Sequence, residues 1–178
     1  ARGGLHPVGA LSMMIQEEGP LFIADTQVHH DPTPAEVAET ALGCARHVRR
    51  FGLTPKIALC CHSQFGNLDT YTGRKMREAL ALLDARKPDF MYDGEMHVDA
   101  ALDPALRERI FPGSRLEGMA NVLVFAGTDA ASGVRNALKM REELQTAPVY
   151  DDEDGWQDPG VTPGREADVG HLRAVVGL

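Results

Sequence analysis

The segment Leu21-Phe22-Ile23-Ala24 is an apolar run without a polar interruption, and Asp25-Thr26 follows it directly. A short apolar run of this kind is typical of a parallel β-strand that is covered on both faces. Similar runs recur further along the chain, at residues 57–61, 90–94 and 121–126. The sequence therefore predicts four buried strands.

Helical patterns separate these strands. Thr33 is a predicted N-cap, Pro34 occupies the first helical position and Glu36 completes a capping box. Gly52 is placed to end this first helix. Three more helices are predicted at residues 76–83, from residue 103 onward and at residues 130–144. Strand and helix thus alternate, which is typical of right-handed βαβ units in an α/β domain with a parallel sheet.

The chain has 178 residues and a formal net charge of −8, which suits one ordinary globular domain. An acidic chain lacks the clustered basic surface that nucleic acid binding requires. No apolar run approaches the ~20 residues of a membrane span, and a signal peptide is not indicated. The three cysteines, with Cys60 and Cys61 adjacent, match neither a disulfide framework nor a zinc-binding pair. We therefore expect a cytoplasmic protein that binds neither nucleic acid nor a membrane.

Three segments are expected along the chain. Residues 1–19 begin without a start methionine in an apolar stretch, so we interpret them as the remnant of a preceding helix. Residues 20–145 form the α/β domain. Residues 146–178 contain seven acidic and two basic residues and lose all periodicity, which predicts an irregular acidic segment with a short terminal helix. The chain is therefore expected to be a piece of a longer protein.

A polar cluster follows each predicted strand, and ligands of open α/β sheets bind beyond the carboxyl ends of the strands. The clusters lie at residues 25–27, 62–67, 93–97 and 127–129. Because these ends share one edge of the sheet, strand-end geometry makes the polar side chains there candidates for ligand binding. The candidates are Ser63, Gln64, Asn67, Asp93, Glu95 and Thr128.

Three other patterns have simpler structural explanations. His29-His30-Asp31 lacks a third metal ligand in a suitable direction, so no metal site is predicted. Glu95 and His97 would lie on the same side of a continued strand, where a hydrogen-bonded pair is a simpler explanation than acid–base catalysis. His62 and Ser63 are adjacent, which seldom gives the geometry of a nucleophile and its base, and the G-x-S-x-G motif is absent. No catalytic residue is predicted.

Seven stretches form a common pattern in order and spacing over residues 20–140. They are residues 22–26, 31–33, 51–59, 62–66, 75–80, 93–102 and 120–125. Together they resemble the phosphate acetyl/butyryl transferase family. Within that family, the His-Ser-x-Phe-Gly loop at residue 62 and Asp-Gly-Glu-Met-His at residue 93 are most similar to the C-terminal phosphotransacetylase-like domain of bacterial NADP-dependent malic enzymes.

This resemblance implies a three-layer α/β/α fold with a mainly parallel sheet, as one domain of a normally two-domain transferase-like fold. It implies acetyl-CoA as a ligand, acting as an allosteric effector, and no cofactor held by this chain. NADP and a divalent metal would be bound only by the malic-enzyme domain. The implied partners are that catalytic domain and further subunits of a homo-oligomer.

The C-terminal segment bears on activity. Active transferases of this family have a Ser-Arg pair followed by an Asp, in which the Arg holds phosphate and the Asp acts as a base toward the CoA thiol. Here the resemblance matches Thr162 to the Ser and Pro163 to the Arg, and Val169 to the Asp, with Asp168 next to it. Proline cannot bind phosphate in the bidentate manner of a guanidinium, so transfer chemistry should be lost. Thr162 joins the candidate ligand-binding residues.

The sequence thus favours an acetyl-CoA-binding regulatory domain of an NADP-dependent malic enzyme, which oxidatively decarboxylates malate to pyruvate, with this chain inactive alone. The alternative is a phosphate acetyltransferase, which converts acetyl-CoA and phosphate to acetyl phosphate and CoA. A third possibility is a structural module that only mediates contacts between subunits.

Overall fold

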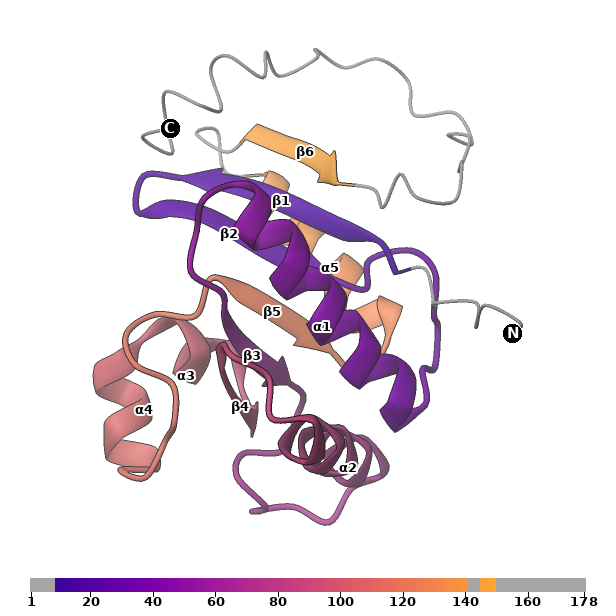
Figure 1. Cartoon of the computed structure of the whole chain (residues 1–178), viewed down its shortest axis with the longest axis vertical. Coiled ribbons are helices and arrows are strands. Elements are labelled where there is room, and N and C mark those ends of the chain that lie inside the picture. The colour runs from indigo at the N-terminus through magenta and orange to yellow at the C-terminus, as the bar shows by residue number, and fades with distance from the viewer. Residues whose placement is uncertain (1–8, 141–144, 150–178) are drawn as a thin grey trace.

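The computed structural model describes residues 9–140 and 145–149, and six strands of this part form one mixed sheet (Figure 1). The strands are β1 Leu11–Gln16, β2 Gly19–Ala24, β3 Lys56–Cys60, β4 Met91–Met96, β5 Val122–Phe125 and β6 Gln145–Val149. Their order across the sheet is β4-β3-β5-β2-β1-β6. β4, β3, β5 and β2 run parallel, whereas β1 is antiparallel to both β2 and β6. The sheet carries the predicted parallel strands at its centre and at one edge.

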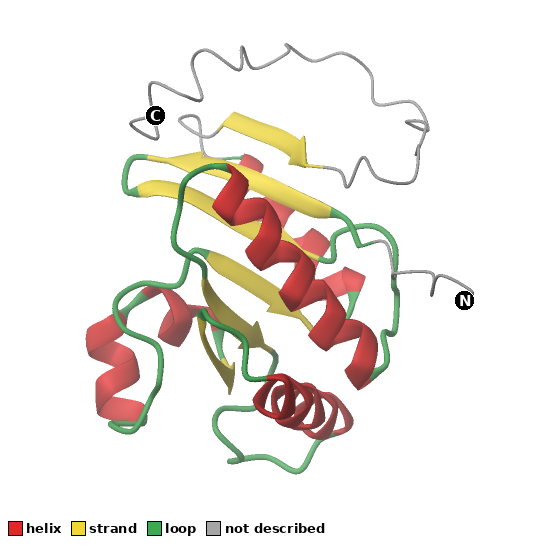
Figure 2. Ribbon diagram, in the orientation of Figure 1, coloured by secondary structure: helices red, strands yellow, loops and turns green. Residues whose placement is uncertain are grey.

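In the described part of the chain, five helices flank this sheet. Figure 2 shows them in red around the strands. They are α1 Pro34–Arg50, α2 Tyr71–Arg86, α3 Val98–Leu102, α4 Pro104–Ile110 and α5 Thr128–Lys139. None of the described helices is long and apolar enough to cross a membrane.

The helices make two apolar layers, one on each face of the sheet. Val37 of α1 and Met76 of α2 belong to the same buried cluster as Phe22 of β2. Ala131 of α5 belongs to a second cluster with Ile23, the next residue along β2. Successive side chains of a strand point to opposite faces, so β2 is buried on both sides, as its continuous apolar run predicts. The predicted α/β/α fold is confirmed.

The predicted cap of the first helix is confirmed. Thr33 Oγ1 accepts a hydrogen bond from Glu36 N at 3.3 Å, and Glu36 Oε2 accepts one from Thr33 N at 2.7 Å. Pro34 occupies the first turn of α1, where its missing N–H costs no hydrogen bond. Asp103 likewise caps α4, since its Oδ1 accepts from Ala105 N at 2.9 Å.

The prediction of a helical remnant at residues 1–19 is wrong for residues 11–16, which form β1. β1 pairs with β2 so that Leu11 lies opposite Ala24 and Gln16 opposite Gly19. A short apolar run has no periodicity that distinguishes a buried strand from a buried helix, and here the pairing with β2 decides. The α/β unit therefore starts before residue 20, while residues 1–8 lie outside the described part.

The C-terminal side also differs from the prediction. α5 ends at Lys139 instead of residue 144, and β6 occupies residues 145–149, where an irregular segment was expected from residue 146. β6 pairs with β1 at the margin of the sheet, and such an outer strand tolerates Pro148 because one side of its backbone needs no partner. The rest of the acidic segment and the predicted terminal helix lie outside the described residues.

Candidate functional site

Loops that follow β2, β3 and β5, together with the end of β4, lie at one edge of the sheet, because these four strands are parallel. β4 is longer than predicted and includes both Asp93 and Glu95 as strand residues. The candidate side chains at this edge form three groups, and each group has its own hydrogen-bond and ion-pair partners.

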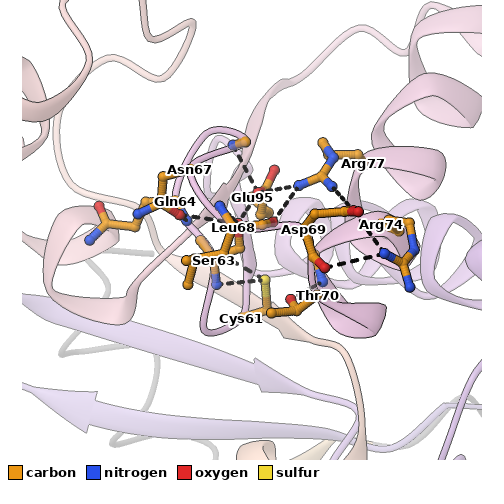
Figure 3. A network of polar contacts seen from close by, with 12 residues as sticks. Cys61, Ser63, Gln64, Asn67, Leu68, Asp69, Thr70, Arg74, Arg77 and Glu95 are labelled. Atoms are coloured by element: carbon orange, nitrogen blue, oxygen red, sulfur yellow. Dashed lines mark hydrogen bonds and ion pairs between the residues drawn. The ribbon is translucent and has the colours of Figure 1, made fainter.

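The first group surrounds the carboxylate of Glu95 and is called the Glu95 cluster (Figure 3). Glu95 Oε1 accepts hydrogen bonds from Ser63 Oγ at 2.5 Å, from Gly66 N at 2.9 Å and from Arg77 Nη1 at 2.8 Å. The Glu95 and Ser63 residues are 1% and 0% exposed. Arg77, on α2, is the ionic partner that a buried carboxylate requires. The cluster thus joins β4, α2 and the loop after β3.

Gln64 and Asn67 shape that same loop. Asn67 Oδ1 accepts from Gln64 N at 2.8 Å and from Ser63 Oγ at 3.3 Å, so the Asn67 side chain closes the loop on itself. Gln64 Nε2 lies 2.6 Å from His97 Nδ1, and His97 Nε2 lies 2.8 Å from the carbonyl oxygen of His62. The sequence favoured a hydrogen-bonded pair of Glu95 and His97, but in the structure the two side chains have different partners.

The second group is built around a buried lysine that the sequence reading did not select. Lys75, on α2, is 4% exposed and forms an ion pair with Asp31 in the loop before α1. Its Nζ also donates to the carbonyl oxygen of Ala126, after β5, at 3.1 Å. Tyr71 Oη donates to Asp31 Oδ2 at 3.1 Å. The hydrogen bond from Lys75 is the main reason that the pKa of Asp31 lies below its usual value.

Thr128 belongs to the surroundings of this second group rather than to the Glu95 cluster. Its Oγ1 lies 2.9 Å from His30 Nδ1, so the start of α5 is joined to the loop after β2. Next to it, the buried Asp25 accepts from Ala10 N at 2.9 Å and lies 2.8 Å from His29 Nδ1. These contacts hold the two loops together and give His29 and His30 different partners.

Asp93, also on β4, is the centre of the third group. Its Oδ2 accepts from Ser114 Oγ at 2.8 Å and from Arg115 N at 2.7 Å, and its Oδ1 accepts from Gly94 N at 2.9 Å. The carboxylate therefore anchors the loop after α4 to the sheet.

The structure brings four of the seven sequence candidates together: Ser63, Gln64, Asn67 and Glu95. Asp93 and Thr128 lie in the other two groups, and Thr162 lies outside the described residues. The main residues that the sequence reading missed are Lys75 and Arg77, because charged residues on an amphipathic helix are ordinarily solvated. The only signal for Lys75 is its place beside Met76 on the apolar face of α2.

Residues 9–140 contain no group of three His, Cys, Asp or Glu side chains that could hold a metal ion. All three cysteines of the chain are free thiols. Burial raises the pKa of the Cys61 thiol, which lies at the start of the loop that carries Ser63, so a reactive thiolate is disfavoured there.

Comparison with known proteins identifies relatives of two kinds. The NADP-dependent malic enzyme of Salmonella typhimurium is 46% identical over 150 residues, which are 83% of this chain and 20% of that enzyme. The phosphate acetyltransferase of Paracoccus denitrificans is 40% identical over 127 residues, which are 71% of this chain and 39% of that protein. This chain thus spans about a fifth of the malic enzyme that it matches.

The fold comparison agrees. A phosphotransacetylase from Streptococcus pyogenes superposes with a TM-score of 0.76 and 28% sequence identity, covering 82% of this chain and 45% of that one. The sequence also matches the family described as phosphate acetyl/butaryl transferase over residues 1–147, which is most of the chain. Sequence and fold therefore lead to the same conclusion: the chain belongs to the phosphate acetyl/butaryl transferase family.

Proposed function

We propose that this chain is the phosphotransacetylase-like domain of an NADP-dependent malic enzyme and that it binds acetyl-CoA as a regulatory ligand. The similarity to the Salmonella typhimurium malic enzyme supports the first part. In this proposal the rest of the enzyme binds NADP and a divalent metal and decarboxylates malate, in a cytoplasmic homo-oligomer. In this proposal the chain itself contributes by binding acetyl-CoA and catalyses no step.

The observation that carries the regulatory role is that the ionisable groups at the strand ends are occupied by internal contacts. Glu95 Oε1 accepts three hydrogen bonds from within the chain, and Ser63 is fully buried, so neither is placed to attack a substrate. Lys75 is held by Asp31 and by a main-chain carbonyl. Polar groups tied in this way can shape a binding surface without taking part in a reaction.

The C-terminal sequence supports the same proposal. The resemblance matches Thr162 and Pro163 to the Ser-Arg pair of active transferases. A proline has no donor for phosphate, so this position cannot stabilise the transferring group. Regulation then requires that acetyl-CoA bind one arrangement of the assembled enzyme more tightly than another, since only differential affinity shifts an equilibrium between states.

Isothermal titration calorimetry with acetyl-CoA tests the proposal. We expect saturable heat with this chain, a higher melting temperature in the presence of the ligand, and no heat with malate. If acetyl-CoA at about millimolar concentration gave neither heat nor a thermal shift, the result would contradict the proposal. The free energy of binding would then be smaller than ~4 kcal/mol. Association of subunits without any response to acetyl-CoA would instead support a purely structural module.

A phosphate acetyltransferase is the second candidate, and the identity with the Paracoccus denitrificans enzyme favours it. The two functions differ in a direct assay. Release of free CoA thiol from acetyl-CoA in phosphate buffer, abolished when phosphate is replaced by sulfate, would establish transfer. Our proposal expects no release above the rate of spontaneous hydrolysis.

A further inference from the structure

We propose that a cavity beside β4 binds a small organic anion, a carboxylate or a phosphate, whose body is planar and apolar. The cavity has a volume of about 340 Å³, and its walls come from the loop after β3, from α2, from β4 and from the loop after α4. This volume lies at the lower end of ordinary small-molecule sites. The proposal does not depend on the binding of acetyl-CoA.

Two arginine side chains in the wall provide positive charge. Arg77 comes from α2 and Arg115 from the loop after α4, and their side chains are 33% and 45% exposed. Each lies near a carboxylate that is almost completely buried: Glu95 for Arg77, and Asp93 for Arg115. These two guanidinium groups are therefore more exposed than the buried carboxylates beside them. At the surface, Arg115 Nη1 also lies 2.6 Å from Asp84 Oδ1 and Arg77 Nη2 lies 3.6 Å from Asp69 Oδ1.

Arg115 retains N–H donors for a ligand. A guanidinium has five N–H donors. Within residues 9–140, Arg115 uses Nη1 to donate to Asp84 Oδ1 at 2.6 Å, while its Nε lies 3.7 Å from Asp93 Oδ1, beyond hydrogen-bond distance. Carboxylates and phosphates match the planar fork of such a group, which makes an organic anion the expected ligand.

The buried carboxylates do not oppose this ligand strongly. Asp93 accepts hydrogen bonds from Ser114 Oγ and from the Arg115 main chain, and Glu95 Oε1 accepts three. Donors from the protein thus compensate much of their negative charge.

An aromatic pair supplies the apolar wall. The rings of Phe65 and Phe111 stack with centroids 4.3 Å apart and an angle of 15° between their planes. Both residues line the cavity, and Phe111 is 38% exposed although it is a large apolar side chain. A planar group of the ligand can extend this stack while its anionic group meets Arg77 or Arg115. Charge and aromatic surface together therefore define the ligand class.

Titration of the ¹⁵N-labelled chain with phenyl phosphate, followed by NMR, tests the site. We expect shifts of main-chain amides in residues 65–66, 93–95 and 111–115, with weaker binding of inorganic phosphate, which lacks the ring. No shifts up to about 10 mM phenyl phosphate, or shifts confined to residues 25–31 and 126–128, would overturn the proposal.

Variants identify the groups responsible. Arg115→Gln removes the guanidinium but keeps the main-chain N–H that anchors the loop to Asp93, and it should weaken binding at least about tenfold. Phe111→Ala should weaken the binding of phenyl phosphate more than the binding of inorganic phosphate. Arg86→Gln is the matched control, since Arg86 is 44% exposed in an ion pair with Glu39 away from the cavity, and it should bind as the wild type does. Equal binding by Arg115→Gln and Arg86→Gln would refute the assignment.

Discussion

Ser63 Oγ lies 2.5 Å from Glu95 Oε1, and this contact ties the loop after β3 to the neighbouring strand β4. Both side chains are excluded from solvent. A buried carboxylate is stable only when donors and a counter-charge compensate it, and Gly66 N and Arg77 complete that set. The loop that carries the family pattern is therefore held by a charge inside the protein.

Replacement of this charge should destabilise the fold. Glu95→Gln leaves Arg77 without its ionic partner, and we expect the free energy of unfolding in urea to fall by about 2–3 kcal/mol. The value is below that of a fully buried pair because Arg77 is 33% exposed. Glu39→Gln, which breaks the more exposed pair with Arg86, is the control and should cost less than ~1 kcal/mol. Equal losses for the two variants would contradict this role of Glu95.

The ion pair of Lys75 and Asp31 predicts a shifted titration. The hydrogen bond from Lys75 lowers the pKa of Asp31 below its usual value, and NMR titration of the carboxyl carbons should detect this. In Lys75→Met the pKa of Asp31 should return toward ~3.9. Asp89, whose pKa is lowered by Arg49, should titrate as in the wild type and serves as the internal control.

The lowered pKa of Asp31 also predicts the direction in which the stability of the fold changes with pH. Because the folded-state pKa of Asp31 is lower than its unfolded value, its contribution is complete above ~pH 4 to 5 and is lost as the pH falls through the folded-state pKa. Urea midpoints measured from pH 6 down to pH 3 should therefore fall less steeply for Lys75→Met than for the wild type. A parallel decline of the two proteins would show that Asp31 is not linked to Lys75 in solution.

The capping box of α1 predicts a local loss. Thr33→Ala removes the oxygen that accepts from Glu36 N, and helix N-caps of this kind contribute about 1 kcal/mol. Thermal unfolding should shift downward by about 2–5 °C. Thr33→Ser keeps the accepting oxygen and should unfold close to the wild type, so a loss as large as that of the alanine variant would assign the effect to the methyl group of Thr33.

The sequence predicted the elements whose signals are local. The apolar run at residues 21–24 and the Thr33 cap are complete within a few residues, and both appear as predicted in β2 and α1. β1 could not be distinguished from a helix, because its identity depends on pairing with β2, which is a tertiary contact. The short helix α3, Val98–Leu102, lacks a side-chain cap and was missed for the same lack of a local signal.

The site was predictable to a similar extent. The rule that ligands lie at strand ends selected Ser63 and Glu95, which the structure places in contact. It could not select Lys75 or Arg77, since only the packing of α2 against the sheet determines that Lys75 is buried and that Arg77 reaches Glu95. It also grouped Asp93 with Glu95, and both line the cavity beside β4. Their partners differ, since Glu95 is bound by Arg77 on α2 and Asp93 by the loop after α4.

The cysteines give a final prediction about access to the core. Burial raises the pKa of the Cys44 thiol to about 12 and also raises the pKa of Cys60, whereas Cys61 is only partly buried. The thiolate is the reacting form and Cys44 is buried, so at pH 8 Cys44 should react with iodoacetamide much more slowly than in urea-unfolded protein. Cys61 should be the first site modified in the folded chain, as read by fragment mass spectrometry. Modification of Cys60 as fast as Cys61 would mean that β3 opens to solvent, and it would contradict the place of β3 inside the sheet, between β4 and β5.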